Sequence, residues 1–166
     1  MARRVLDEAR RRRLRLVTAE SCTGGLLASL LTDIPGCSHA FERGFVVYTE
    51  DAKRELLGVP AHLLQSPGPV SEEVARAMAE GALAHSHGDL AIAVTGYADG
   101  LAGPAGKSGI VHFAVARRGR AHPPLRQALR PPRPRRNPHP LAPSRARPRL
   151  GKPRRPGMRP PRLQDQ

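Results

Sequence analysis

The sequence changes character at Arg117, and this change limits what the chain can fold into. Thirteen of its 18 prolines lie in the last fifty residues, about one at every fourth position. The same fifty residues carry 16 Lys and Arg, a single acid at Asp165, and no aromatic residue. Such a segment repels itself and has too few apolar side chains for a core. We therefore predict a disordered Arg/Pro-rich tail over residues 117–166.

The first 116 residues have the composition of one small domain. They carry 12 Lys and Arg against 13 Asp and Glu, so the net charge of +14 belongs to the tail. No apolar run approaches the ~20 residues of a membrane span, and no apolar stretch follows the basic start. Two cysteines, Cys22 and Cys37, do not make a disulfide framework. We expect a cytoplasmic protein with no membrane partner.

Helical and strand patterns alternate along this domain. We expect helices over residues 2–13, 26–31, 51–57 and 71–85, a further turn over 60–64, and strands over 14–19, 41–49, 90–95 and 110–116. Ser71 is the expected N-cap of the clearest helix, because two acids and an apolar repeat follow it. Alternation of this kind predicts an α/β fold with three layers.

The segment over residues 18–25 is the most informative for chemistry. A strand pattern ends there, small hydroxyl residues follow, and a helical pattern begins. Free N–H groups at a helix start suit a phosphate, a carboxylate or an oxyanion, and Gly24 and Gly25 allow close approach of a ligand. Ser21 is then a candidate nucleophile. The alternative is a Ser or Thr N-cap followed by a glycine turn.

Cys22 competes with Ser21 as the nucleophile. A thiol at a helix start is expected to have a lowered pKa. The alternative is a buried small hydrophobic residue, which is the commoner role of a lone cysteine.

Two other segments carry candidate site residues. Lys53 lies five residues after Tyr48, in the first turns of a helix, and a desolvated Lys can act as a base for a Ser; the alternative is a surface Lys. Thr95 and Gly96 lead into a glycine-rich loop with Gly103, and loops after sheet strands bind ligands in α/β proteins; the alternative is a flexible connection. No His or Cys spacing is typical of a zinc site, so we expect no metal.

Together, five segments resemble the C-terminal domain of the CinA family in order and spacing; they cover residues 18–25, 41–48, 52–59, 68–75 and 93–96, with the loop through Gly103. Stand-alone members of that family are nicotinamide mononucleotide deamidases. The resemblance covers residues 2–116 and implies a three-layer α/β/α sandwich around a mixed sheet. It also implies an amidohydrolase of pyridine nucleotide salvage that needs no metal or other cofactor. That enzyme converts nicotinamide mononucleotide and water to nicotinic acid mononucleotide and ammonia.

The resemblance also implies roles for single residues. Ser21 is the nucleophile and Lys53 its base, Tyr48 belongs to the same hydrogen-bonding group, and Thr95 is a fourth polar residue of the site. The residues implied to bind substrate are Thr23, Gly24, Gly25, Gly96 and Gly103.

Two departures from the family pattern matter. Glu50 stands where the family usually has Asn, and its charge is expected to raise the pKa of Lys53 and make it a poorer base. Residues 117–166 resemble neither the last strand nor the long C-terminal helix of the family, whose Arg suits the substrate phosphate. Our hypothesis is a frameshift shortly after Arg118, which leaves the domain without that strand and helix. An inactive chain is then an alternative.

Two other functions remain open. The tail has 16 cationic residues that can neutralise phosphates, so the chain could be a nucleic-acid-binding protein. Without aromatic residues the tail is not expected to read bases, and incidental binding is the weaker form of this hypothesis. The other alternative is a catalytically silent nucleotide-binding domain linked to competence. We expect a small-molecule nucleotide as the partner, and the sequence leaves a homo-oligomer open.

Overall fold

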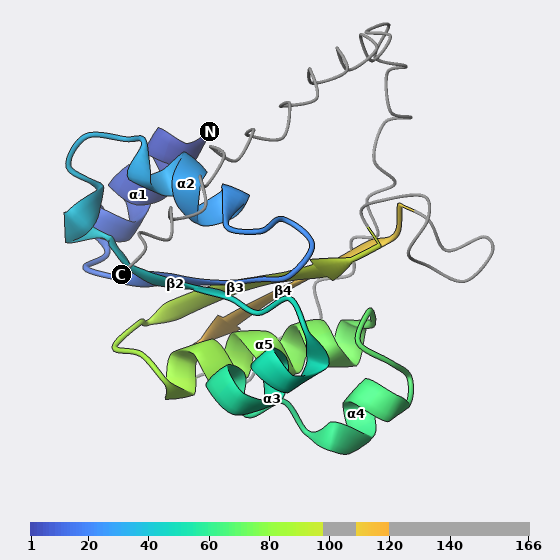
Figure 1. Cartoon of the computed structure of the whole chain (residues 1–166). Helices are drawn as coiled ribbons and strands as arrows, with labels where there is room; N and C mark the ends of the chain where they lie inside the picture. The colour runs from blue at the N-terminus through green and yellow to red at the C-terminus, as the bar shows by residue number, and fades with distance from the viewer. Residues whose placement is uncertain (98–108, 120–166) are drawn as a thin grey trace, which may run out of the picture. The chain divides into compact units, whose positions relative to one another are not determined.

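A four-stranded mixed sheet forms the centre of the molecule (Figure 1), in a computed structural model that describes residues 1–97 and 109–119. The strand order is β2-β1-β3-β4. The first pair, β1 (Leu16–Glu20) and β2 (Phe41–Val46), is parallel, and so is the pair of β1 with β3 (Leu90–Gly96). The fourth strand, β4 (Val111–Arg117), is antiparallel to β3. The predicted α/β class and the mixed sheet are thereby confirmed.

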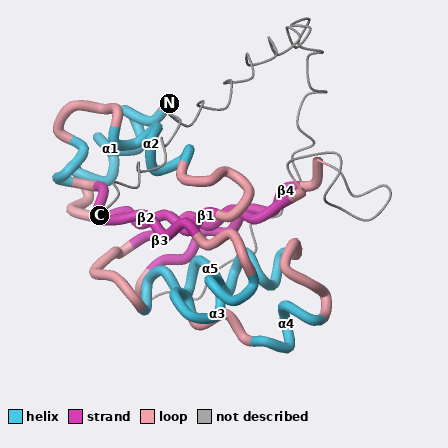
Figure 2. Tube along the Cα trace, viewed as in Figure 1, coloured by secondary structure: helices cyan, strands magenta, loops and turns pink. Residues whose placement is uncertain are grey.

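Helices cover both faces of this sheet (Figures 1 and 2). One face carries α1 (Ala2–Arg11) and α2 (Leu26–Thr32), followed by a short 3₁₀ turn, η1 (Cys37–His39). The other face carries α3 (Glu50–Leu57), α4 (Ala61–Gln65) and α5 (Glu72–Ala84). This is the predicted three-layer arrangement.

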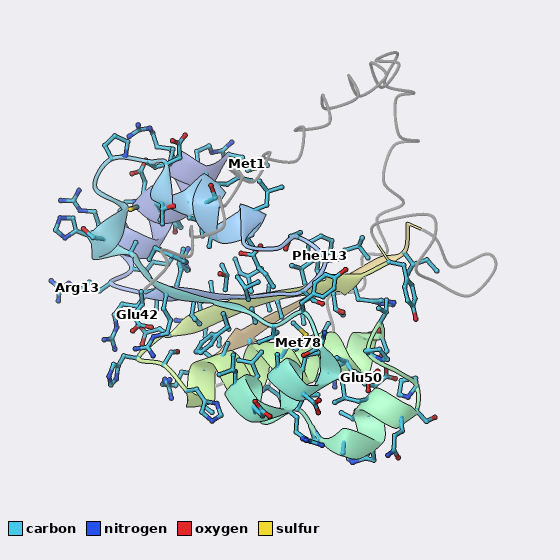
Figure 3. The ribbon with its side chains drawn as sticks, viewed as in Figure 1. Met1, Arg13, Glu42, Glu50, Met78 and Phe113 are labelled. Atoms are coloured by element: carbon cyan, nitrogen blue, oxygen red, sulfur yellow. The ribbon has the colours of Figure 1, made fainter. Side chains whose placement is uncertain are left out.

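Two hydrophobic clusters fill the space between the layers. Because side chains alternate across a strand, Val17 and Ala19 of β1 face one layer and Leu16 faces the other. Val17 and Ala19 belong to the cluster that contains Met78, which lies between α5 and the sheet (Figure 3). Leu16 packs in the second cluster with Leu6 of α1. Each helical layer is therefore held by burial of its own apolar face.

The longest helix, α5, begins as its sequence predicts. The Ser71 hydroxyl accepts a hydrogen bond from the Val74 N–H at 3.3 Å, so the predicted N-cap is confirmed. Val74, Met78 and Ala82 are fully buried at helical spacing. The capped start and this apolar stripe together position α5 on the sheet.

Some boundaries differ from the sequence prediction, for local reasons. The first helix ends at Arg11 rather than 13, because Arg13 adopts a left-handed φ of 54°. The strand predicted over 41–49 ends at Val46. The next residues leave the sheet, and the Thr49 hydroxyl accepts from the Ala52 N–H at 3.1 Å to start α3.

The topology creates a switch point at the carboxyl end of β1. From β1 the chain passes to β2 through α2 on one face, and from β2 it passes to β3 through α3, α4 and α5 on the opposite face. Open α/β sheets bind ligands at such a point, outside the carboxyl ends of the strands.

Residues 120–166 lie outside the described residues. The predicted disorder of the tail and the proposed loss of a strand and a helix therefore remain predictions. The domain boundary that composition predicts after residue 116 falls inside β4, which continues through Arg117. Within the described ranges, no helix is long and apolar enough to cross a membrane.

Candidate active site

Ser21 is the first residue after β1, and the sheet holds it in place. Its N–H donates to the Val94 carbonyl of β3 at 3.0 Å. On the other side, the Val47 N–H donates to the Glu20 carbonyl at 2.8 Å. The residue is 7% exposed. The end of β1 is thus clamped between both neighbouring strands, and the Ser21 hydroxyl sits at the switch point.

Lys53 meets Ser21 from α3, 32 residues further along the chain. Its side chain is buried, and its Nζ lies 3.0 Å from Ser21 Oγ. The same Nζ donates to the backbone carbonyls of Val47 at 3.1 Å and Tyr48 at 3.0 Å. Three oxygen atoms therefore hold the amine, one of which belongs to the candidate nucleophile.

This arrangement suits both protonation states of Lys53. A charged ammonium has three N–H donors, one for each oxygen. A neutral amine keeps two donors and one lone pair. Because the carbonyls of Val47 and Tyr48 can only accept, they take both donors, and the lone pair is left for the Ser21 hydroxyl to donate into. The geometry thus favours proton transfer from Ser21 to Lys53.

The pKa of Lys53 is lowered. Burial lowers it, because the charged form loses hydration, and the nearby Glu50 and Cys22 raise it by less. The charge of Glu50 acts in the predicted direction. The predicted effect of Glu50 on this pKa is thereby confirmed, and burial of the amine, which the sequence does not measure, outweighs it.

The pKa of the Cys22 thiol is raised, which corrects the lowered value expected for a helix start. Burial is the largest cause; its own backbone N–H and Lys53 lower the pKa, and Glu20 raises it. Cys22 is free and half-buried. A thiol that keeps its proton is the weaker competitor for the role of nucleophile.

The start of α2 is occupied by Glu20, which was not predicted to be a site residue. Its buried carboxylate accepts from the Leu27 N–H at 2.9 Å and the Ala28 N–H at 2.7 Å. The alternative of a Ser or Thr N-cap is wrong, since the cap position is Gly25 and no side chain there makes a capping bond. These N–H groups bind Glu20 and so are taken. The sequence feature that could have predicted this role is the position of an acid directly before the hydroxyl residues that precede α2.

A cavity of about 500 Å³ opens beside Ser21 and Lys53. Its described lining comes from the carboxyl edge of the sheet, the start of α3 and the loop before α5: Ser21, Cys22, Tyr48, Thr49, Glu50, Lys53, Pro69, Val70, Thr95, Gly96, Tyr97. A larger cavity of about 810 Å³ lies beside α1, but its described lining carries no Ser, Cys or Lys. The smaller cavity is therefore the candidate site.

Thr95 and Tyr48 enter this site in different ways. The buried Thr95 hydroxyl donates to the Pro69 carbonyl at 2.9 Å, so it ties the end of β3 to the cavity wall. Tyr48 is 71% exposed. It reaches Lys53 through its backbone carbonyl, and its phenol makes no hydrogen bond with the described part of the chain.

Three of the five residues predicted to bind substrate lie outside the described lining of the cavity. The Thr23 hydroxyl donates to the Glu20 carboxylate at 2.6 Å, and Gly24 and Gly25 shape the turn with φ of 59° and 97°. None of these three lines the cavity. Gly96 does, and a Cβ there would also meet the Ile110 carbonyl at 2.8 Å.

The predicted contribution of Gly103 falls outside the described residues. Among residues 1–97 and 109–119, no group of His, Cys, Asp and Glu side chains is placed to hold a metal ion.

Fold and site together define an α/β protein with a Ser–Lys pair at the switch point of a mixed sheet. The chain belongs to the CinA C-terminal domain family, whose model matches residues 1–130. The family match extends to residue 130, 14 residues beyond residue 116, where the sequence was expected to stop resembling the CinA family.

Known relatives agree with this assignment. A putative competence-damage inducible protein of Symbiobacterium thermophilum is 55% identical over 114 residues, covering 66% of this chain and 26% of that protein. A CinA-like protein of Akkermansia muciniphila is 51% identical over 111 residues, or 64% of this chain and 26% of that protein. The chain thus spans about a quarter of the length of the curated relatives it matches.

Solved structures show the same fold. The competence/damage inducible protein CihA of Agrobacterium tumefaciens is 48% identical, with a TM-score of 0.68 over 70% of this chain and 72% of that one. A CinA superfamily protein of Escherichia coli is 36% identical, with a TM-score of 0.69 over 76% of each chain.

Proposed function

We propose that this chain is an amidohydrolase with Ser21 as nucleophile and Lys53 as its base. The observation that carries the proposal is the 3.0 Å contact between Lys53 Nζ and Ser21 Oγ, buried at the edge of a cavity. The proposed substrate is nicotinamide mononucleotide, hydrolysed to nicotinic acid mononucleotide and ammonia. The chain belongs to the CinA C-terminal domain family. The substrate is supported by the resemblance of the sequence to the stand-alone members of that family, which are nicotinamide mononucleotide deamidases.

The proposed reaction has two halves. In the first, Ser21 Oγ attacks the amide carbon while its proton passes to the neutral amine of Lys53. The resulting ammonium gives that proton to the amide nitrogen, the C–N bond breaks, and ammonia leaves an ester on Ser21. In the second, Lys53 takes a proton from water, hydroxide attacks the ester, and the proton returns to Ser21 Oγ as the carboxylic acid leaves.

The charge that develops on the carbonyl oxygen needs hydrogen-bond donors. The backbone N–H groups of Cys22 and Thr23 directly follow the nucleophile. The first interacts with its own thiol, and neither donates to a backbone carbonyl of the described residues. In our proposal these two groups hold the oxyanion, which in comparable sites is worth about 3 kcal/mol per donor.

The test is ammonia release from nicotinamide mononucleotide. Ser21→Ala is expected to lower kcat by at least about a thousandfold, because the nucleophile is lost. Cys22→Ala is the matched control, and we expect it to keep activity within about tenfold of the parent chain. Activity that survives Ser21→Ala and disappears in Cys22→Ala would assign the chemistry to the thiol.

The other functions predicted from the sequence remain hypotheses. Nucleic-acid binding depends on the tail over residues 117–166, of which the structure describes only residues 117–119. No described feature favours this function over the hydrolase. A catalytically silent nucleotide-binding domain is distinguished by the same assay, since it would bind the nucleotide without releasing ammonia. Self-association stays an open expectation.

A further inference from the structure

The described lining of the cavity beside Ser21 carries one net negative charge when the Lys53 amine is neutral. Among its described lining residues, Glu50 is the only acid and Lys53 the only cation. The Lys53 amine is already held by Ser21 and two backbone carbonyls, and it lies buried at the base. Glu50 is exposed and makes no ion pair within the described residues. The open side of the cavity therefore presents a free carboxylate.

The helix places this carboxylate at the mouth rather than the base. Glu50 is the first residue of α3, three positions before Lys53 and hence on the same side of the helix (Glu50 is labelled in Figure 3). The neighbouring cation, Arg54, pairs with Asp51 at 3.2 Å. Lys53 is the only cation of the described lining, and in its neutral, active form it leaves the charge of Glu50 uncompensated there.

The proposed reaction at Ser21 fixes the orientation of a bound amide. Its carbonyl carbon must reach Ser21 at the base, so the pyridinium ring follows and the ribose end points toward the mouth. On a nucleotide, that outer end carries a phosphate. Phosphate and the Glu50 carboxylate are then on the same side of the cavity, and like charges repel.

We propose that Glu50 is a specificity-determining residue that selects against the phosphate of the substrate. It favours amides whose only charge is the cationic pyridinium ring, so the unphosphorylated riboside gains relative to the nucleotide. The proposal rests on the proposed function, because it takes the amide to react at Ser21. Repulsion between two like charges across a partly screened cavity corresponds to an effect of about three- to tenfold.

The experiment compares kcat/KM for nicotinamide mononucleotide and nicotinamide riboside, which share the same amide and ring. Glu50→Gln is expected to raise the ratio of nucleotide to riboside by about three- to tenfold at low salt, and by less at high salt. Asp51→Asn is the matched control. It removes the same charge from the adjacent residue of α3, outside the cavity lining, and is expected to keep the ratio within about twofold.

The ratio isolates the proposed role. A change in the basicity of Lys53 or in the fold alters both substrates alike and cancels. An unchanged ratio in Glu50→Gln, or the same shift in Asp51→Asn, would overturn the proposal.

If the parent chain hydrolyses neither amide, the proposed function fails and binding still decides the inference. Calorimetric Kd values for both ligands on Ser21→Ala and on Ser21→Ala with Glu50→Gln should show the same change of ratio. A Kd ratio that does not move, or no binding of either ligand, overturns the inference.

Discussion

At the scale of single residues, the position of one amine decides what the site can do. Lys53 is sequestered from water, and its two carbonyl partners leave one direction free, toward Ser21. Burial lowers the pKa of the amine despite the opposing charge of Glu50. A base that loses its proton more readily is available to a larger fraction of the molecules near neutral pH.

This geometry predicts a pH dependence. The neutral amine is the active form, so kcat/KM should rise with pH through the lowered pKa of Lys53 and level off above it. Glu50→Gln removes a charge that raises this pKa, so the rising limb should move to lower pH. The pH profile of ammonia release measures both effects. A limb that stays in place, or moves to higher pH, would contradict the role of Lys53 as base.

At the scale of elements, the packing of α5 against α3 holds the base in register with the nucleophile. A Cβ at Gly81 of α5 would lie 2.0 Å from the Leu57 carbonyl at the end of α3. Gly is normally a poor residue inside a helix. Here it allows the two helices to approach, and α3 carries Lys53 to the sheet edge.

Gly81→Ala is therefore expected to lower the free energy of unfolding by about 1–3 kcal/mol, although Ala is the better helix former. Urea unfolding followed by circular dichroism measures it. Glu80→Ala, an exposed change on the preceding residue of the same helix, is the control and should be close to neutral. If Gly81→Ala is as stable as the parent, α3 moves away from the added methyl group with no loss of stability, and the close contact is not required.

At the scale of the whole domain, the end of β4 is tied to the far end of α5. Arg118 donates through Nε to the Gly88 carbonyl at 3.0 Å and through its terminal nitrogen to the Ser86 carbonyl at 3.1 Å and to that of Leu83. These carbonyls lie at and beyond the end of α5, where a cation is favourable. The edge strand and the longest helix are thus joined by one guanidinium.

We expect Arg118→Ala to destabilise the domain by about 1–2 kcal/mol, because three carbonyls lose a charged donor and the site is partly exposed to water. Arg76→Ala removes an exposed Arg that pairs with Glu72 on the surface of α5, and it should cost about 0.5 kcal/mol or less. Urea midpoints for the two variants provide the comparison. Equal losses would mean that Arg118 acts as an ordinary surface charge.

Local sequence patterns were enough to predict the order of helices and strands and the position of the candidate nucleophile. The alternation of elements, the cap at Ser71 and the segment around Ser21 depend on residues a few positions apart, and each can be predicted from propensity and spacing. The near neutrality of the first 116 residues is likewise a property of the sequence alone.

Tertiary structure decided the contacts and the pKa values of the site, because burial and contact between distant segments cannot be predicted from a local sequence pattern. The sequence linked Lys53 to Ser21 only through the family resemblance, because 32 residues separate them, and the structure supplied their contact. The pKa of Cys22 shifted in the direction opposite to the prediction, because desolvation outweighs the helix start. The pKa of Lys53 is lowered although Glu50 raises it as predicted, because desolvation outweighs this neighbouring charge. Glu20 captured the N–H groups expected to bind a ligand, because the fold buries its carboxylate beneath α2.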